Sequence, residues 1–334
     1  MTVFERRITA YAKINWFLKI LGTREDGYHL LKTLMESVSL SDTVTLVCSD
    51  SAGKDGLRPG IQLTANLPFI PTDSKNTAYK AARAYLNALG RKDISVGIHI
   101  EKRIPTQAGM GGGSADAAAV LNGLADIFPE AVSRRDLMTI AAGIGADVPF
   151  CMDGGTQLCE GIGDILKPVG PLGGLPLLFI KPRCSVSTPW AFGEFDRISA
   201  LTSGQAAGTD RLPDESSDES SDESSGAAAL TACLANEALD RFVTAPAGSD
   251  PLGRLKAAAP WLENDLESVA ESRFPELSDI RGWLDAHGAV FSRMSGSGST
   301  LFGVFEKADA RDAAFCEARA YFGETYFVEA GTTL

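Results

Sequence analysis

The first hundred residues show the apolar patterns of strands separated by the spacing of a helix. Residues 43–48 and 94–100 alternate between apolar and polar side chains, and residues 6–21 form an apolar run rich in strand-forming residues. Between residues 78 and 89 the apolar side chains recur every three or four positions. Asn76 is placed to cap that helix and Gly90 to end it, so this region predicts mixed strands and helices.

Two more helices are expected before residue 150. One follows Gly113, with Ala117, Val120, Leu121 and Leu124 on one face. The other begins at Ser133, where a serine followed three residues later by an acid resembles a capping box. These elements complete a first domain that we expect to span residues 1–160.

The pattern restarts after residue 160 and predicts a second domain over residues 161–334. A crossing rich in proline and glycine (167–176) leads to a short apolar strand at 177–180. A helix containing residues 277–284 is expected to stop at Gly288, and strands at 289–294 and 300–305 are joined by a serine- and glycine-rich loop at 295–299. The fold class expected for the whole chain is α+β.

Residues 209–226 interrupt this second domain with a low-complexity acidic insertion. Asp-Glu-Ser-Ser occurs there three times in succession, without aromatic or β-branched residues inside the repeat. Such a composition does not offset the entropy of ordering. We expect a solvated surface insertion, and a phosphorylated or protein-docking segment is the alternative.

Composition adds bounds on function. With 334 residues, 44% of them hydrophobic, the chain is long enough for two cores. Its net charge of −12 argues against a broad basic surface for nucleic acid, although the seven acids and one base of 209–226 account for −6 of it. No apolar run of about 18 residues or signal-peptide layout occurs, and the six cysteines are scattered. We therefore expect a cytoplasmic protein with buried thiols, bound to neither nucleic acid nor membrane.

A glycine-rich segment carries the strongest chemical signal. Residues 105–115 read Pro-Thr-Gln-Ala-Gly-Met-Gly-Gly-Gly-Ser-Ala, between a predicted strand and a predicted helix. Glycines let main-chain N–H groups approach a ligand, and the helix start adds unpaired donors, so phosphate is the natural guest. Ser114 is a candidate for capping the helix or for contacting a phosphate or metal, and Lys102 and Arg103 bring positive charge. A plain turn onto a packed helix would also use glycines, and the Walker pattern is absent.

Two further segments supply polar groups. Lys13 and Asn15 lie two residues apart in a predicted strand, so their side chains share one face. Asp147 follows the predicted third helix in a segment of small and apolar residues. Alone, Asp147 is equally typical of a structural turn. Beside Lys13 and a phosphate cradle it becomes a candidate general base.

The order of these segments resembles the GHMP small-molecule kinases. Lys13, the glycine loop, Asp147 in Gly-Ala-Asp-Val-Pro and the loop at 294–300 occur in that order. Residues 10–31, ending in Asp-Gly-Tyr-His-Leu-Leu, resemble members that phosphorylate a cytidine-diphosphate-linked sugar alcohol on the non-mevalonate route to isoprenoid precursors. The resemblance implies an N-terminal ribosomal-protein-S5-like domain and a C-terminal ferredoxin-like domain, with ATP and substrate between them.

The resemblance also implies roles for residues of this chain. Asp147 would take the proton of the substrate's 2-hydroxyl, with Lys13 beside it. ATP and Mg²⁺ are the implied cofactors, and the implied binding partner is a small-molecule substrate. The protein itself is expected to be a monomer or a homodimer. The residues implied near ATP are Asn76, Lys102, Pro105, Thr106, Gln107, Ala108, Gly109, Met110, Gly111, Gly112, Gly113, Ser114 and Ala115. Those implied near the substrate are Asn15, Tyr28, His29, Thr188 and Phe192, with Tyr28 and Phe192 enclosing a cytosine ring and His29 at its edge.

Some residues depart from the family pattern. Ala115 and Asp116 stand where the family has serine and asparagine, and Gln107 and Ala108 vary the start of the loop. The insertion at 209–226 is also unexpected. Two alternatives stay open: a GHMP kinase for another alcohol, such as homoserine or mevalonate, and a catalytically silent nucleotide-binding protein.

Overall fold

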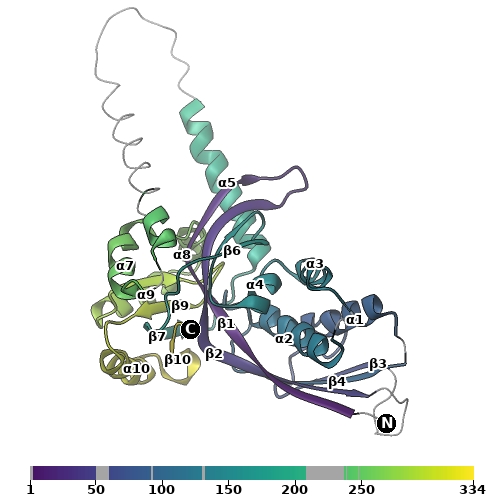
Figure 1. Cartoon of the computed structure of the whole chain (residues 1–334). Coiled ribbons are helices and arrows are strands. Elements are labelled where there is room, and N and C mark those ends of the chain that lie inside the picture. The colour runs from purple at the N-terminus through teal and green to yellow at the C-terminus, as the bar shows by residue number, and fades with distance from the viewer. Residues whose placement is uncertain are drawn as a thin grey trace, which may run out of the picture.

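The computed structural model describes residues 3–49, 60–91, 93–129, 132–207, 237, 239–246 and 248–334. The acidic insertion expected at 209–226 lies outside the described residues. Two sheets organise the chain, and helices cover one face of each (Figure 1). The α+β class expected from the sequence is confirmed.

The first sheet is built on two long antiparallel strands, β1 (Val3–Thr23) and β2 (His29–Ser49), which run through the centre of the molecule in Figure 1. The remaining strands are β3 (Gly60–Ala65), β4 (Ser95–Glu101), β5 (Thr156–Glu160) and β6 (Ile165–Pro168). The order is β3-β4-β2-β5-β6, with β1 paired to β2, and the β3–β4 pair is parallel. Because β6 pairs with β5, this sheet continues past residue 160. We therefore propose a boundary after Pro168.

Four helices belong to the first part: α1 (Thr77–Leu89), α2 (Gly112–Ile127), α3 (Arg134–Ile144) and α4 (Val148–Asp153). Asn76 caps α1 by accepting from the Ala78 N–H, and Gly90 ends it in a left-handed conformation, as predicted. Ser133 caps α3 through the N–H of Asp136, also as predicted. The alanine-rich α2 packs on β1 and β2 beneath α1, α3 and α4 and is buried on most sides.

The second sheet is antiparallel throughout, in the order β10-β7-β9-β8. Its strands are β7 (Pro176–Lys181), β8 (Phe291–Met294), β9 (Leu301–Val304) and β10 (Phe327–Thr332). The helices of this part are α5 (Thr188–Ala207), α7 (Pro251–Ala258), α8 (Glu267–Arg273), α9 (Glu276–Ala286) and α10 (Ala308–Phe322). The predicted strand, helix and loop of this part are all present, and α9 and α10 pack against the sheet.

The two sheets are joined at the middle of β2. The Leu334 N–H donates to the Ser37 carbonyl at 3.0 Å, and the Thr332 N–H donates to the Ser39 hydroxyl at 2.9 Å. One continuous apolar core includes Ile14 of the first sheet and Phe179 and Phe302 of the second. The two parts of the chain are therefore connected by main-chain hydrogen bonds and by a shared core. Among the described residues, no helix is both long and apolar enough to cross a bilayer.

Glu36, on β2, places an ionisable group inside this core. Its side chain is fully buried and its Oε2 accepts from the Thr156 hydroxyl at 2.5 Å. Burial raises the pKa of Glu36 to about 7, although Thr156 and the charge of Arg254 act in the opposite direction. The folded protein therefore holds a proton there that the unfolded chain releases at lower pH.

We expect Glu36→Gln to change how stability depends on pH. Between about pH 4.5 and pH 7 the unfolded wild-type chain loses the Glu36 proton while the folded protein keeps it, so rising pH lowers the free energy of unfolding, by on the order of 2–3 kcal/mol in total. Glutamine does not titrate. Urea unfolding at pH 5 and pH 8 should show the variant gaining stability relative to wild type by that amount. The exposed Glu25→Gln is the control, and parallel pH profiles for Glu36→Gln and wild type would refute the assignment.

Candidate active site

A cavity of about 730 Å³ lies where the glycine loop, β1, the start of α4 and the serine- and glycine-rich loop at 295–299 come together. Lys13, Asn15, Asp147, Thr188, Phe192, Asn76, Lys102 and residues 105–114 all line it. Segments far apart in the chain thus meet as the sequence led us to expect. Ala115, Tyr28, His29 and Arg103 do not appear in its lining.

Irregularities in β1 aim Lys13 into the cavity. The pairing of β1 with β2 shifts register between Tyr11 and Lys13 and again between Asn15 and Phe17. Such bulges redirect side chains and are common beside active sites. The Lys13 ammonium donates to Asn15 Oδ1 at 2.6 Å, and the Asn15 amide donates to the Thr33 hydroxyl at 2.8 Å. The predicted shared face of Lys13 and Asn15 is therefore present.

Asp147 faces Lys13 from the first sheet's helical layer. It precedes α4, and its Oδ2 lies 3.5 Å from the Lys13 ammonium. The Lys13 side chain is 5% exposed, whereas that of Asp147 is 30% exposed and remains open to a ligand. A buried cation beside an accessible carboxylate is an arrangement suited to accepting a proton from a bound hydroxyl.

The glycine loop passes through gaps that admit no side chain. A Cβ on Gly109 would lie 1.9 Å from the Ser295 carbonyl oxygen, and one on Gly111 would lie 3.0 Å from Lys13 Cγ. Both glycines have positive φ, 73° and 68°. Main-chain hydrogen bonds fix the loop on either side: Lys13 N–H donates to Met110 and Thr300 N–H donates to Ala108.

The beginning of α2 provides donors for an anion. Its N-cap is Gly111, which has no side chain to cap the helix, so the first N–H groups point toward the cavity with the positive end of the helix dipole. Our suggestion that Ser114 caps the helix is wrong, because α2 begins at Gly112 and Ser114 lies inside its first turn. Its side chain lines the cavity and stays a candidate for contact with phosphate or metal. Ala115 is buried against the core on the other side of that turn.

Lys102 proves to be a structural clamp. Its ammonium forms ion pairs with Asp42 and Asp116, and all three side chains are at most 5% exposed. Asp42 also accepts from the N–H groups of Arg103 and Ile104, so one cluster holds both the entrance of the glycine loop and the first turn of α2. Burial lowers the pKa of Lys102, but the charges of Asp116 and Asp42 outweigh burial and raise it overall. Burial raises the pKa of Asp116 to about 7, against the effect of Lys102.

The positive charge expected at the loop entrance is therefore largely neutralised. Lys102 is paired with two acids, and Arg103 lies 3.9 Å from Glu329 outside the main cavity. Both polar atoms of Asn76 are also engaged, one as the cap of α1 and the other with the Pro71 carbonyl. Lys75, Asp116 and Ser297 also line the cavity, although none of them was assigned to the site from the sequence. Asp116 directly follows the glycine loop and Ser297 lies in the loop at 294–300, so both belong to segments that the sequence pointed to, whereas Lys75 carries no local signal.

The expected aromatic site is arranged differently from the sequence interpretation. His29 stacks on Phe192, with ring centroids 4.6 Å apart, and its Nε2 lies 2.9 Å from Asp196. Tyr28 is 60% exposed in the turn between β1 and β2, outside the cavity lining, because that turn projects beyond the sheet. The enclosure of a base by Tyr28 and Phe192 stays a prediction.

Gln107, one of the departures from the family pattern, adopts a backbone conformation that favours glycine. Its φ is 50°, in the left-handed region that favours glycine, and it is the non-glycine residue with positive φ in the described part of the chain. Such a conformation costs roughly 1–2 kcal/mol. A glycine at position 107 would adopt this φ without that cost.

Comparisons with known proteins identify the class. The models of the GHMP kinases N-terminal domain and of the GHMP kinases C-terminal domain match residues 76–155 and 237–324. A mevalonate kinase from L. major solved with R-mevalonate has a TM-score of 0.68 at 16% identity, covering 98% of this chain and 95% of that one, which shows a shared fold. This chain belongs to the GHMP kinase family, and the two-domain fold expected from the resemblance is confirmed.

Within the GHMP kinase family, the relatives with higher sequence identity to this chain share one name. The chain is 33% identical over 319 residues to a 4-diphosphocytidyl-2-C-methyl-D-erythritol kinase of Clostridium acetobutylicum, covering 96% of this chain and 98% of the relative. It is 38% identical over 314 residues to the enzyme of the same name from Synechococcus sp. (strain JA-3-3Ab), covering 92% and 88%. A crystal structure of 4-(cytidine 5'-diphospho)-2C-methyl-D-erythritol kinase matches at 33% identity and a TM-score of 0.66, covering 98% and 99%.

The clamp on the glycine loop yields a stability prediction. Lys102→Met would leave two buried carboxylates without their cation, and breaking a buried pair in this way typically costs about 3–5 kcal/mol. We expect a loss of that size in the free energy of unfolding, measured with urea. The neighbouring Arg103→Met removes an exposed charge and should cost under about 1 kcal/mol. Equal effects of the two substitutions would contradict the clamp.

Proposed function

We propose that this chain transfers the γ-phosphoryl group of ATP to the 2-hydroxyl of 4-diphosphocytidyl-2-C-methyl-D-erythritol, a step in the synthesis of isoprenoid precursors. The observation that carries the proposal is the Lys13–Asp147 pair, 3.5 Å apart beside the glycine loop and open to one cavity. Relatives with that name extend over nearly the whole chain. A binding protein without catalysis would need neither member of the pair.

In this mechanism Asp147 accepts the proton as the substrate hydroxyl oxygen attacks the γ-phosphorus. A new P–O bond forms, the bond from the γ-phosphorus to the bridging oxygen breaks, and ADP leaves. The Lys13 ammonium lies 3.5 Å from Asp147 Oδ2 and would stabilise charge on the transferring group. Asn15 holds the ammonium at 2.6 Å from its own amide oxygen and so fixes its direction.

The donors at the start of α2 suit the ATP phosphates. A Cβ at Gly109 would overlap the Ser295 carbonyl oxygen, and one at Gly111 or Gly112 would lie only 3.0 Å from a side-chain carbon. Glycine is therefore favoured at these positions, which supports a loop whose main-chain N–H groups bind phosphate. The Ser114 hydroxyl is the side-chain oxygen we assign to Mg²⁺, a hard cation that prefers oxygen ligands. Bound with ATP, Mg²⁺ would offset phosphate charge during transfer. Location in the cytoplasm and the oligomeric state stay predictions.

The substrate's cytosine is assigned to the region around Phe192 and His29. An aromatic face beside a polar ring can stack a base and contact its edge. Thr188, at the start of α5, and Asn15 also line the cavity and are assigned to the diphosphate and sugar alcohol. The cytidyl group would thus be held away from the reacting hydroxyl, near the turn between β1 and β2.

Removal of the proposed base tests the mechanism. Asp147→Asn keeps the shape of the side chain but cannot accept the proton, so we expect kcat to fall by about 10²- to 10⁴-fold. ADP release should be measured with the cytidyl substrate, ATP and Mg²⁺. Asp153→Asn, at the exposed end of α4, is the matched control and should keep wild-type activity. ADP release by Asp147→Asn at the wild-type rate would refute the assigned role.

Substrate selection has its own test. Phe192→Ala removes the stacking face, and a stack is worth about 1–3 kcal/mol per base, so KM for the cytidyl substrate should rise roughly 5- to 100-fold while KM for ATP stays unchanged. The wild-type enzyme should show no comparable turnover of homoserine or mevalonate. An unchanged KM for the cytidyl substrate, or efficient turnover of either alcohol, would reject this specificity.

A further inference from the structure

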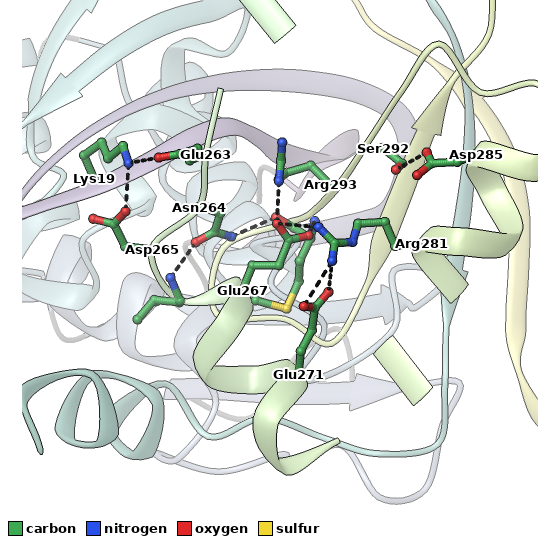
Figure 2. Close-up of polar contacts among 12 residues, drawn as sticks. Lys19, Glu263, Asn264, Asp265, Glu267, Glu271, Arg281, Asp285, Ser292 and Arg293 are labelled. Carbon is green, nitrogen blue, oxygen red and sulfur yellow. Dashed lines mark hydrogen bonds and ion pairs between the residues drawn. The ribbon is translucent and has the colours of Figure 1, made fainter. Parts of the chain in front are cut away.

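A polar network packs against the serine- and glycine-rich loop. At its centre is the segment 263–267, which leads into α8 and contains the buried side chains of Asn264 and Glu267 (Figure 2). The Leu18 N–H donates to the Glu263 carbonyl, and the Asp265 N–H donates to the Leu18 carbonyl, both at 2.9 Å. This segment is therefore bonded directly to the strand that carries Lys13 and Asn15.

Asn264 spans the beginning of the loop. Its amide nitrogen donates to the carbonyls of Met294 and Gly296, both at 2.8 Å, and its Oδ1 accepts from the Leu266 N–H at 3.0 Å. The residue is 5% exposed, both of its amide N–H donors are used, and its amide oxygen accepts one hydrogen bond. A buried amide bonded in this way fixes the backbone around it.

Glu267 holds the same loop from the next turn. Its Oε1 accepts from the Met294 N–H at 3.0 Å, and its Oε2 lies 2.7 Å from the Arg293 guanidinium. Arg281 also approaches it, at 4.0 Å, and forms a closer pair with Glu271. Figure 2 shows these side chains converging on Glu267 from α8, α9 and β8. The carboxylate is 4% exposed, so its position is set by these partners.

The other side of the loop touches the reacting groups. A Cβ on Gly296 would lie 3.1 Å from the Lys13 ammonium and 3.3 Å from Asn15 Oδ1, and the Ser295 hydroxyl donates to the Gly109 carbonyl at 2.9 Å. Gly296 therefore lies close beside Lys13, with no room for a side chain between them, and Ser295 is bonded directly to the glycine loop.

We propose that Asn264 and Glu267 are positioning residues for the phosphoryl transfer, because they set the distance between the 295–299 loop and both Lys13 and the glycine loop. This inference rests on the proposed function. Neither side chain contacts the substrate; each acts through the backbone of Met294 and Gly296. Misplacement of a catalytic group by about 1 Å can lower a rate 10²-fold.

Asn264→Asp tests the proposal with almost no change in shape. A carboxylate cannot donate to the two carbonyls, so we expect kcat to fall about 10²-fold, KM for the cytidyl substrate to stay within about threefold, and the Kd of a non-hydrolysable ATP analogue to rise about tenfold. Glu267→Gln can still accept from Met294 but loses its charge, and should lower kcat about tenfold. Asp285→Asn is the control: it bonds Ser292 at the far end of β8, and its kcat should stay within twofold of wild type.

The same Asn264 substitution made in a Lys13→Met variant distinguishes a positioning role from general destabilisation. If Asn264 acts through Lys13, adding Asn264→Asp to Lys13→Met should lower the residual rate by less than about threefold, because residues that act as a unit are not additive. Phosphoryl transfer from radiolabelled ATP measures these low rates. An equal 10²-fold loss in both backgrounds would overturn the proposal. So would an unchanged kcat in Asn264→Asp, or loss of the cooperative unfolding transition in both Asn264→Asp and Glu267→Gln.

The wild-type protein separates this inference from the proposed function. If wild type does not turn over the cytidyl substrate, the proposed function fails, and the ATP-analogue Kd still reports whether Asn264 positions the glycine loop. If wild type is active and all the Asn264 and Glu267 variants match it in kcat and Kd, only the positioning role fails.

Discussion

The close passage of the glycine loop against the 295–299 loop is the constraint on which the site depends. The backbone at Gly109 lies so near the Ser295 carbonyl that a methyl group would overlap it. Hydrogen bonds from Ser295 to Gly109 and from Thr300 to Ala108 make this contact a fixed seam between the two parts of the chain. Both loops that meet at this seam line the cavity, together with Lys13 and the start of α2.

Buried charges support the seam from both sides. Lys102 with Asp42 and Asp116 holds the glycine loop, and Glu267 with Arg293 holds the opposing loop. Removing charges from water is costly, and an apolar replacement of similar volume is often as stable, so such clusters are poor explanations of stability alone. The geometry of these two clusters indicates a different role, which is to hold the backbone of the two loops in place. Asp42 accepts two N–H groups and Glu267 accepts one, so each carboxylate fixes backbone that lines the cavity.

Local signals in the sequence predicted local structure well. The cap at Asn76 and the stop at Gly90 defined α1 correctly, and the alternation at 94–100 located β4. The early part of β2 was missed, because its residues 34–38 are buried on both faces and carry no alternation. Lys13, Asn15 and Asp147 were selected correctly as neighbours in space. Their geometry depends on two bulges in β1, which the amino-acid pattern does not reveal.

Interactions between residues that are far apart in the sequence were harder to predict. The position of Lys102 before the loop indicates positive charge at its entrance, and the family resemblance implies a place near ATP, yet its partner Asp42 lies 60 positions away in sequence. Asn264 drew no attention, since an asparagine between two acids is typical of a surface turn; only the fold places it under Met294 and Gly296. A sequence shows which groups are present, whereas their roles here depend on which partners already satisfy them.

These pairings change how the cavity would hold phosphates. Lys13 is balanced by Asp147 and Lys102 by two acids, so paired side chains supply little net positive charge. Lys75 adds a cation at the cavity wall, but the donors nearest the glycine loop are main-chain N–H groups and the dipole of α2. Such fixed dipoles need no reorganisation during transfer, and a divalent cation bound with ATP would provide the charge that the side chains lack. The acidic composition of the chain is therefore compatible with the proposed anionic ligands, because their recognition would rest on oriented backbone donors and not on net charge.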